Sequence, residues 1–130
     1  MPTTIETVEA IYAAMAAKDF DAIFTLIDPE CVITQDERLP WGGRHVGHDG
    51  FATFGLALTG SITSSVEIEA LYEADDEVIQ FGHTRGTVNA TGVEFDIAEV
   101  HRWVIRDGKA LRAHFAIDTP GMLEALAKQA

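Results

Sequence analysis

The chain has 130 residues, of which 47% are hydrophobic and 23% charged, the balance of an ordinary globular protein. This length fits one domain over residues 1–130 and is too short for two. Acidic residues outnumber basic residues 21 to 9, for a formal net charge of -12. Nucleic acid and anionic membranes attract basic faces, so the composition argues against both partners.

The single cysteine, Cys31, excludes an internal disulfide and a zinc site built from several thiolates. The N-terminus shows no basic segment followed by an apolar run, and no uncharged apolar stretch approaches the roughly 20 residues of a membrane span. We therefore expect a cytoplasmic protein. His45 and His48 lie too close together in a loop to favour a metal site, and we expect neither a metal nor a cofactor.

The first part of the chain predicts two helices. Thr3 and Glu6 match a capping box, and apolar residues then recur at helical spacing over 5–15. Asp19 can cap a second, shorter helix. Pro29 ends that helix, because the residue before a proline avoids the helical conformation.

The segment that follows is mixed. Residues 31–34 predict a short strand, and 35–47 predict a loop rich in glycine and proline. A third helix is expected over 48–58, with Gly60 placed to end it.

The second half predicts an antiparallel meander. Apolar and polar residues alternate in four long segments, at 62–72, 77–88, 93–105 and 109–118. Asp107-Gly108 is the clearest hairpin turn, and Thr119-Pro120 opens a last helix. Helices and antiparallel strands in separate runs indicate an α+β fold. Strands this long curl around helices, and the concave side suits a small-molecule pocket.

Four stretches carry a resemblance to a known superfamily. They are the helix pair at 8–27, Leu-Pro-Trp-Gly-Gly-Arg-His-Val-Gly-His at 39–48, Arg-Asp-Gly-Lys at 106–109 and Phe-Ala-Ile-Asp-Thr at 115–119. On these stretches the chain resembles the NTF2-like superfamily, and within it the SnoaL-like polyketide cyclases and the proteins related to ketosteroid isomerase. The resemblance implies a cone in which a curved, mixed, mostly antiparallel sheet wraps on N-terminal helices. It also implies a homodimer formed through the sheet.

The third predicted strand carries the most informative polar pair. Its apolar residues Val93, Phe95 and Ile97 define an inward face, and the same alternation continues to Glu99 and His101. Burying either side chain without a partner would be costly, so a polar pocket would explain both. Histidine suits general acid-base work near neutral pH. The alternatives are a satisfied structural ion pair, or a strand that twists both residues towards solvent.

Asp118 stands at the end of the last strand, where the resemblance to SnoaL-like cyclases and limonene epoxide hydrolases implies a catalytic acid or base. His101 would then be its partner, and Glu99 would orient His101. The alternation of residues 111–117 places Asp118 on the face away from the core unless a bulge intervenes. The alternative role is to begin the Thr119-Pro120 helix.

Further residues are expected to bind substrate, namely Tyr12, Trp41, Phe54, His83, Arg85, Trp103 and His114. Arg85 could hold a carboxylate or enolate oxygen, although pairing with a glutamate on the next strand is the alternative. The resemblance to classical ketosteroid isomerases places their tyrosine within one residue of Tyr12. It places their base near Gln35 or Asp36.

The superfamily hosts several activities and also non-catalytic binders, so the fold does not choose among them. The resemblance favours a cofactor-independent enzyme that uses general acid-base proton transfer on a small apolar or polycyclic carbonyl compound. Isomerase, cyclase and hydratase chemistry would all fit this description. The alternative is a non-catalytic small-molecule binding or dimerisation domain.

Overall fold

The computed structural model describes residues 3–129, and these form four helices and six strands. In chain order the elements are α1 (Thr4–Ala17), α2 (Phe20–Leu26), β1 (Ile27–Gln35), β2 (Gly43–Val46), α3 (Gly47–Ser61), β3 (Ile62–Ala74), β4 (Glu77–Val88), β5 (Glu94–Arg106), β6 (Lys109–Ile117) and α4 (Thr119–Ala127). None of the helices in this range is long and apolar enough to cross a membrane.

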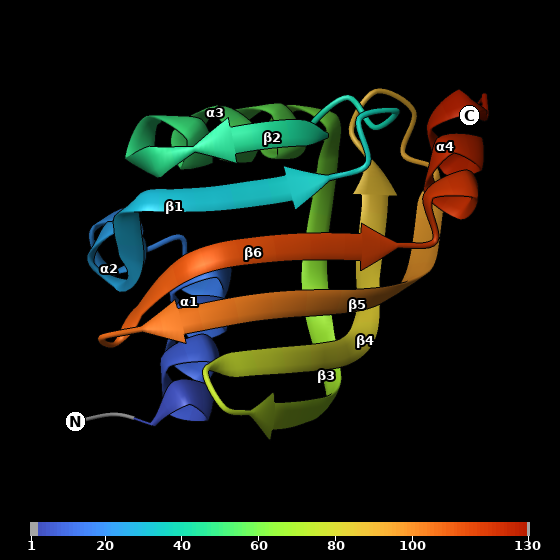
Figure 1. Cartoon of the computed structure of the whole chain (residues 1–130). Coiled ribbons are helices and arrows are strands. Elements are labelled where there is room, and N and C mark those ends of the chain that lie inside the picture. Colours follow the sequence, from blue (N-terminus) through green and yellow to red (C-terminus); the bar gives the residue numbers. More distant parts are fainter. Residues whose placement is uncertain (1–2, 130) are drawn as a thin grey trace.

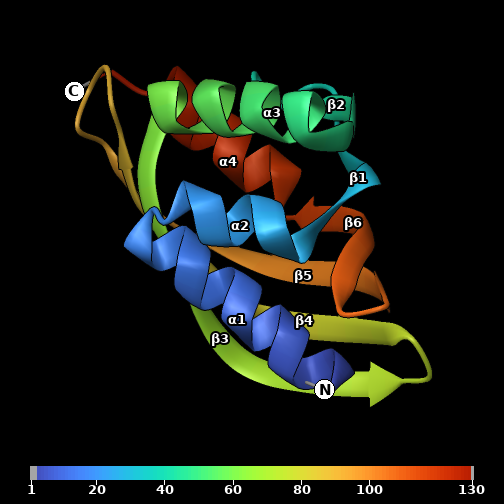
Figure 2. The same cartoon turned by 90° about the vertical axis from the view of Figure 1, so that its left-hand side faces the viewer.

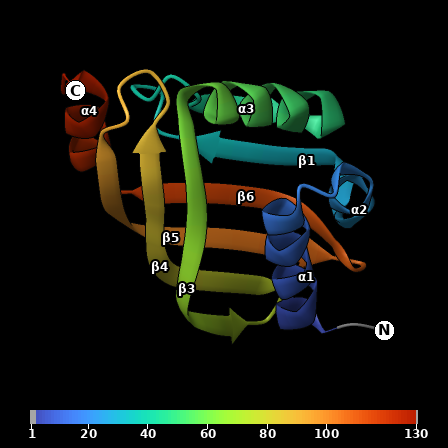
Figure 3. The same ribbon diagram turned by 180° about the vertical axis from the view of Figure 1, so that it is seen from behind.

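The strands build one mixed, curved sheet in the order β2-β1-β6-β5-β4-β3 (Figure 1). Neighbouring strands are antiparallel except β1 and β6, which pair in parallel. Helix α1 packs against β3, β4 and β5, whereas α3 packs against β1 and β2. Both helices lie on the same side of the curved sheet (Figure 2, Figure 3). This arrangement confirms the α+β class.

The core fills the space between the sheet and these helices, and β5 shows the underlying pattern most clearly. Its residues alternate between buried and exposed along nearly the whole strand, with Phe95, Ile97, Glu99, His101, Trp103 and Ile105 inward. Strict alternation of this kind is expected of a strand with one covered face. The face that we predicted from the alternation is therefore confirmed, including its two ionisable residues.

The loop predicted over 35–47 requires a correction. It contains β2, which pairs with the last four residues of β1 from Val32–Val46 to Gln35–Gly43. Strand β1 is also longer than predicted and includes Pro29. The pairing of β1 with β6 is irregular between Ile27 and Val32, where a proline without an N–H group is tolerated.

A second correction concerns the end of α3, which continues through Gly60 to Ser61. Gly60 does not adopt a positive φ angle and so does not act as a helix terminator. Gly82 on β4, in contrast, permits a close approach. A Cβ atom there would lie 2.1 Å from the backbone oxygen of Glu67 on β3, so a side chain would push these strands apart.

Candidate functional site

A cavity of about 70 Å3 lies between the sheet and the helices and is partly open to solvent. Residues from both ends of the chain line it, among them Tyr12, Trp41, Phe54, Thr84 and His101. Among residues 3–129, no Asp, Glu, Lys or Arg contributes to the lining. The cavity is thus mainly apolar with a few polar groups, the usual character of a site for a small neutral molecule.

The Tyr12 hydroxyl is the centre of a buried hydrogen-bond network beside this cavity. Trp103 Nε1 lies 2.9 Å from the hydroxyl oxygen, Gln80 Nε2 lies 3.2 Å from it and His101 Nδ1 lies 2.8 Å from it. The ring of Tyr12 is also stacked on His101 and meets Trp103 edge-on. Helix α1 is thereby tied to the inner faces of β4 and β5.

The donors in this network fix the tautomer of His101. An indole N–H and an amide NH2 can only donate, so Tyr12 accepts from Trp103 and Gln80. The hydroxyl hydrogen of Tyr12 then goes to Nδ1 of His101, which must be unprotonated. The single ring proton of a neutral His101 is therefore on Nε2, which faces Glu99 Oε1 at 3.4 Å.

Glu99 is the buried acid of the site, and its side chain is 0% exposed. Gln80 donates to Oε2 at 2.5 Å, and the Thr84 hydroxyl donates to Oε1. Both donors stand on β4, the neighbouring strand. Because Thr84 also lines the cavity, its hydroxyl connects the cavity to the buried carboxylate.

Burial shifts the pKa values of the ionisable groups in this network. Burial raises the pKa of Tyr12 well above its ordinary value, so the phenol stays protonated. Burial lowers the pKa of His101 to about 3, and the charge of His114 acts in the same direction. Burial raises the pKa of Glu99, although its hydrogen bonds from Thr84 and Gln80 oppose that shift. His101 is therefore neutral at physiological pH.

The structure brings together six of the residues predicted for the site. Glu99, His101 and Trp103 lie on one face of β5, while Tyr12 contacts His101 and Trp103 from α1. Trp41 and Phe54 line the same cavity as Tyr12 and His101.

Asp118 lies apart from this cluster. It is exposed, and its carboxylate accepts from the N–H of Gly121 at 3.1 Å as the N-cap of α4. The alternation of β6 explains this position, because Ala113 and Phe115 are buried on the other face. Asp118 thus occupies the capping position that the sequence offered as its alternative role.

Three predicted binding residues, His83, Arg85 and His114, require a correction of position. Directly opposed residues on antiparallel strands share a face, and Glu99 is opposite Gly82 in β4. Since Glu99 points inward, His83 and Arg85 point outward. His83 lies between Glu69 and Asp96, with 2.7 Å to each. Arg85 pairs with Glu67 and Asp96, as its alternative role required.

His114 also lies on the outer face, where it is exposed and bonds with Thr34 at 2.7 Å. Asp36, near the place of the ketosteroid isomerase base, is paired with Arg38, which lowers the pKa of Asp36 to about 2.

Two polar residues of the cavity region were missed from the sequence, namely Gln80 and Thr84, and Gln35 was named only by the resemblance to ketosteroid isomerases. In β4 the apolar Ile79 and Phe81 suggested that the odd-numbered residues face the core. The even-numbered residues do so instead, and Gln80 is 0% exposed. The need of Glu99 for donors was the one signal that pointed to β4, because a buried carboxylate requires hydrogen-bond partners.

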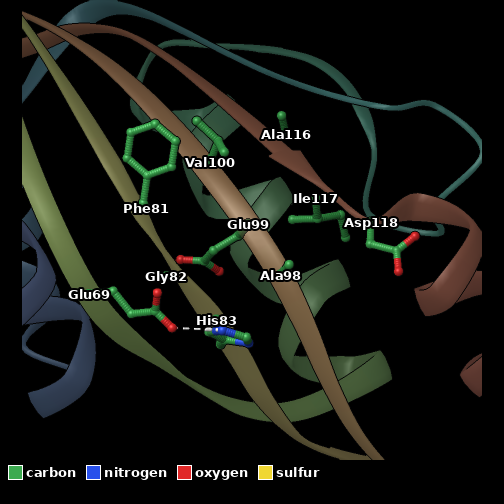
Figure 4. Close-up of a pocket in the computed structure, with 10 residues that line it drawn as sticks. All are labelled: Glu69, Phe81, Gly82, His83, Ala98, Glu99, Val100, Ala116, Ile117 and Asp118. Carbon is green, nitrogen blue, oxygen red and sulfur yellow. Dashed lines mark ion pairs between the residues drawn. The ribbon is translucent and has the colours of Figure 1, made fainter.

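A second, shallower cleft of about 400 Å3 lies on the outer face of the sheet (Figure 4). Phe81, Val100 and Glu99 are among the residues that line it, together with the ion pair of His83 and Glu69 and with Asp118. Within residues 3–129 no group of three His, Cys, Asp or Glu side chains could hold a metal ion.

Solved structures establish the class of fold. An NTF2-like protein from Burkholderia thailandensis E264 is 26% identical, with a TM-score of 0.90 over 98% of this chain and 100% of that chain. TerC, co-crystallized with polyporic acid, is 25% identical, with a TM-score of 0.87 over 96% of this chain and 98% of that chain. A protein with a ketosteroid isomerase-like fold from Catenulispora acidiphila DSM 44928, in complex with trimethylamine, is 19% identical. Its TM-score is 0.77 over 95% of this chain and 93% of that chain. The predicted NTF2-like cone is confirmed.

The family follows from the sequence. The model of the SnoaL-like domain matches residues 8–113, most of the chain, and the protein therefore belongs to the SnoaL-like family. This family includes cyclases and isomerases. No curated protein matches the chain in sequence.

Proposed function

We propose that this protein is a cofactor-independent enzyme that moves a proton on a small neutral carbonyl compound held in the cavity. The supporting observation is Thr84, a residue that lines the cavity and whose hydroxyl donates to the buried Glu99 carboxylate. Glu99 would accept the proton through this hydroxyl, and its raised pKa brings it closer to the neutral range in which a general base works best.

The proposed step breaks a C–H bond beside the carbonyl and leaves an enolate. The proton forms an O–H bond on Thr84 as the original Thr84 hydrogen passes to Glu99. Return of a proton to the same or another carbon completes an exchange or an isomerisation. Nε2 of His101 lies 3.4 Å from Oε1 of Glu99, and His101 keeps its own ring proton throughout. In this scheme His101 is a positioning residue, and Asp118 has no part.

Cavity size favours a small ligand over a polycyclic one. A volume of about 70 Å3 is roughly half that of an engineered cavity that binds benzene, so a ligand with a single small ring would fill the cavity and reach into its open side. A polycyclic ligand would have to displace side chains or extend through the open side. Two of the similar proteins were solved with a small molecule, trimethylamine or polyporic acid, which supports a small-molecule ligand for this protein.

Deuterium exchange tests the enzyme without knowledge of the product. Cyclopentanone is incubated with the protein in D2O, and NMR follows loss of the hydrogens beside the carbonyl. We expect Glu99→Gln to slow the protein-dependent exchange by about 100-fold or more, the usual contribution of a general base. Glu69→Gln, the same change on the outer face, should leave the rate unchanged. A protein that fails to accelerate the exchange would refute the proposal.

A non-catalytic binding domain is the second candidate, and the saturated Tyr12 hydroxyl favours it. That hydroxyl has one donor and two acceptor sites, all of them used within the protein. In this case the network would shape the cavity and do no chemistry. Ligand binding that persists in Glu99→Gln, together with no exchange in the wild type, would select this candidate.

The outer face of the sheet supports the proposed homodimer. Tyr72, Phe81 and Val100 are 61%, 42% and 38% exposed. Tyr72 and Phe81 also contact each other on this face, at 5.7 Å between ring centroids. Apolar groups gathered on a surface commonly mark an interface. Sedimentation should show a dimer that Phe81→Glu dissociates, and a stable wild-type monomer at micromolar concentration would remove this part of the proposal.

The cytoplasmic location expected from the sequence also remains a proposal. Cys31 is buried and unpaired, and burial raises the pKa of its thiol to about 12. A cysteine kept as a thiol is compatible with a reducing compartment. Fractionation of cells that express the tagged protein tests the location directly.

A further inference from the structure

Gln35 has a buried polar atom without a partner. It ends β1, where it pairs with Gly43 of β2, and its side chain is part of the cavity lining. The residue is only 8% exposed. Its Oε1 atom is fully buried and accepts no hydrogen bond from any residue in the range 3–129. Such an orphan is costly in a folded protein, which points to a donor supplied by a bound molecule or a water.

Gln80 provides an informative contrast, since its Oε1 atom is the other buried orphan in the same range. That oxygen lies against Gly82, where a Cβ atom would approach it to 2.4 Å. The amide nitrogen of Gln80 is already bonded to Glu99 and Tyr12. Gln80 does not contribute to the cavity lining, whereas Gln35 does. Of the two orphans, Gln35 is the one whose side chain lines the cavity, so a turn of its amide group would present Oε1 to a ligand there.

We propose that Oε1 of Gln35 accepts a hydrogen bond from a hydroxyl group of the ligand, so the protein selects hydroxyl-bearing neutral compounds. This deepens the proposed function and rests on the cavity as the binding site. A carboxamide is neutral and cannot act as a base, so Gln35 contributes selection and orientation. Burial of the orphan oxygen makes the selection effective, because a ligand without a donor leaves that oxygen unpaired.

The test is a double comparison of two ligands and two proteins. Cyclopentanol and methylcyclopentane differ by a hydroxyl in place of a methyl group and are otherwise closely matched in size. Their dissociation constants are measured by NMR titration, following the backbone amides of β1 and the indole N–H of Trp41. The variants are Gln35→Met, which keeps the length of the side chain, and Gln35→Leu. Gln129→Met, a change at an exposed position near the C-terminus, is the matched control.

In the wild type the side-chain amide of Gln35 should accept a hydrogen bond from the hydroxyl group of cyclopentanol. Gln35→Met should weaken binding of cyclopentanol about fivefold to tenfold more than binding of methylcyclopentane, the effect of one buried hydrogen bond. Gln35→Leu should act in the same direction, and Gln129→Met should change neither constant. Removal of an unpaired oxygen should not lower the melting temperature. Equal weakening for both ligands would overturn the inference, as would a wild type that binds neither.

This outcome is separable from the enzymatic proposal. A hydroxyl preference that depends on Gln35, in a protein that does not exchange the hydrogens of cyclopentanone, would support the inference and refute the enzyme. Exchange that depends on Glu99 with no effect of Gln35 on alcohol binding would do the reverse.

Discussion

Removal of one oxygen atom, in the variant Tyr12→Phe, should destabilise the protein more than any conservative surface change. The hydroxyl accepts from Trp103 and Gln80 and donates to His101. Phenylalanine keeps the ring and its packing against His101 and Trp103. The measured loss therefore reports on the polar network alone.

The magnitude follows from what each partner loses. Trp103 is 0% exposed, so its N–H becomes an unpaired buried donor, which costs about 1–3 kcal/mol. His101 loses its donor, although Gln80 Nε2 at 3.2 Å can replace part of that bond, so this loss adds about 1 kcal/mol. We expect about 2–4 kcal/mol in total. For a chain of 130 residues this corresponds to a fall in Tm of roughly 8–16 °C.

The assay is thermal and urea denaturation followed by circular dichroism, with Tyr72→Phe as the control. Tyr72 is the second tyrosine of the chain and is 61% exposed, so its hydroxyl is in water and its loss should change stability by less than about 0.5 kcal/mol. Nitrogen NMR of the histidine rings would report the tautomer of His101 in the wild type. Equal stability of the two variants, or a proton on Nδ1, would refute the assignment of Tyr12 as the centre of the network.

Three further predictions concern neighbouring residues. Because of His101, the free energy of unfolding should fall by about 1.4 kcal/mol per pH unit as the pH falls from about 6.5 towards 3. The pKa of His101 is lower in the folded state, so the unfolded chain binds the proton first. Urea titrations should show a shallower decline for His101→Gln, and parallel declines would contradict this. Gly82→Ala should cost about 2–4 kcal/mol because its Cβ would meet a backbone oxygen at 2.1 Å, whereas Gly55→Ala, with nothing within 4 Å, should be neutral or stabilising in the same denaturation assay. Asp118→Ala should lose about 1 kcal/mol of cap stability with unchanged deuterium exchange, and a loss of exchange would restore Asp118 as the base.

Local patterns in the sequence predicted those parts of the fold that local interactions determine. The capping box of Thr3 and Glu6 is present in both directions. Asp107 and Gly108 have φ angles of 52° and 72°, as the tight turn between β5 and β6 requires. Strand β2 escaped prediction because it is short, exposed and flanked by glycines. Its register depends on β1, an interaction that no local pattern records.

The candidate site was predictable only where alternation was unambiguous. On β5 the apolar Phe95 and Ile97, with Val93 just before the strand, precede Glu99 in phase, so the inward face followed directly. On β4 both faces contain apolar residues, because Phe81 is partly exposed on the outer face. Inner positions of β4 are instead filled by Gln80, Gly82 and Thr84, which complement Glu99. Which residues of β4 face the core is determined by the pairing of β4 with β5, and the sequence of β4 alone could not predict it.

The buried network bears on function because polarity in a core is not a general source of stability. A well-packed apolar set of side chains in place of a buried polar cluster is often as stable or more stable. Here burial displaces the two ionisable groups in opposite directions, lowering the pKa of His101 and raising that of Glu99. Both shifts favour the uncharged forms, so Glu99 is the group of this pair that can gain a proton with least penalty. Glu99 is therefore a buried carboxylate that gains a proton readily and is connected to the cavity through Thr84. Proton transfer explains such a group better than a contribution to folding does.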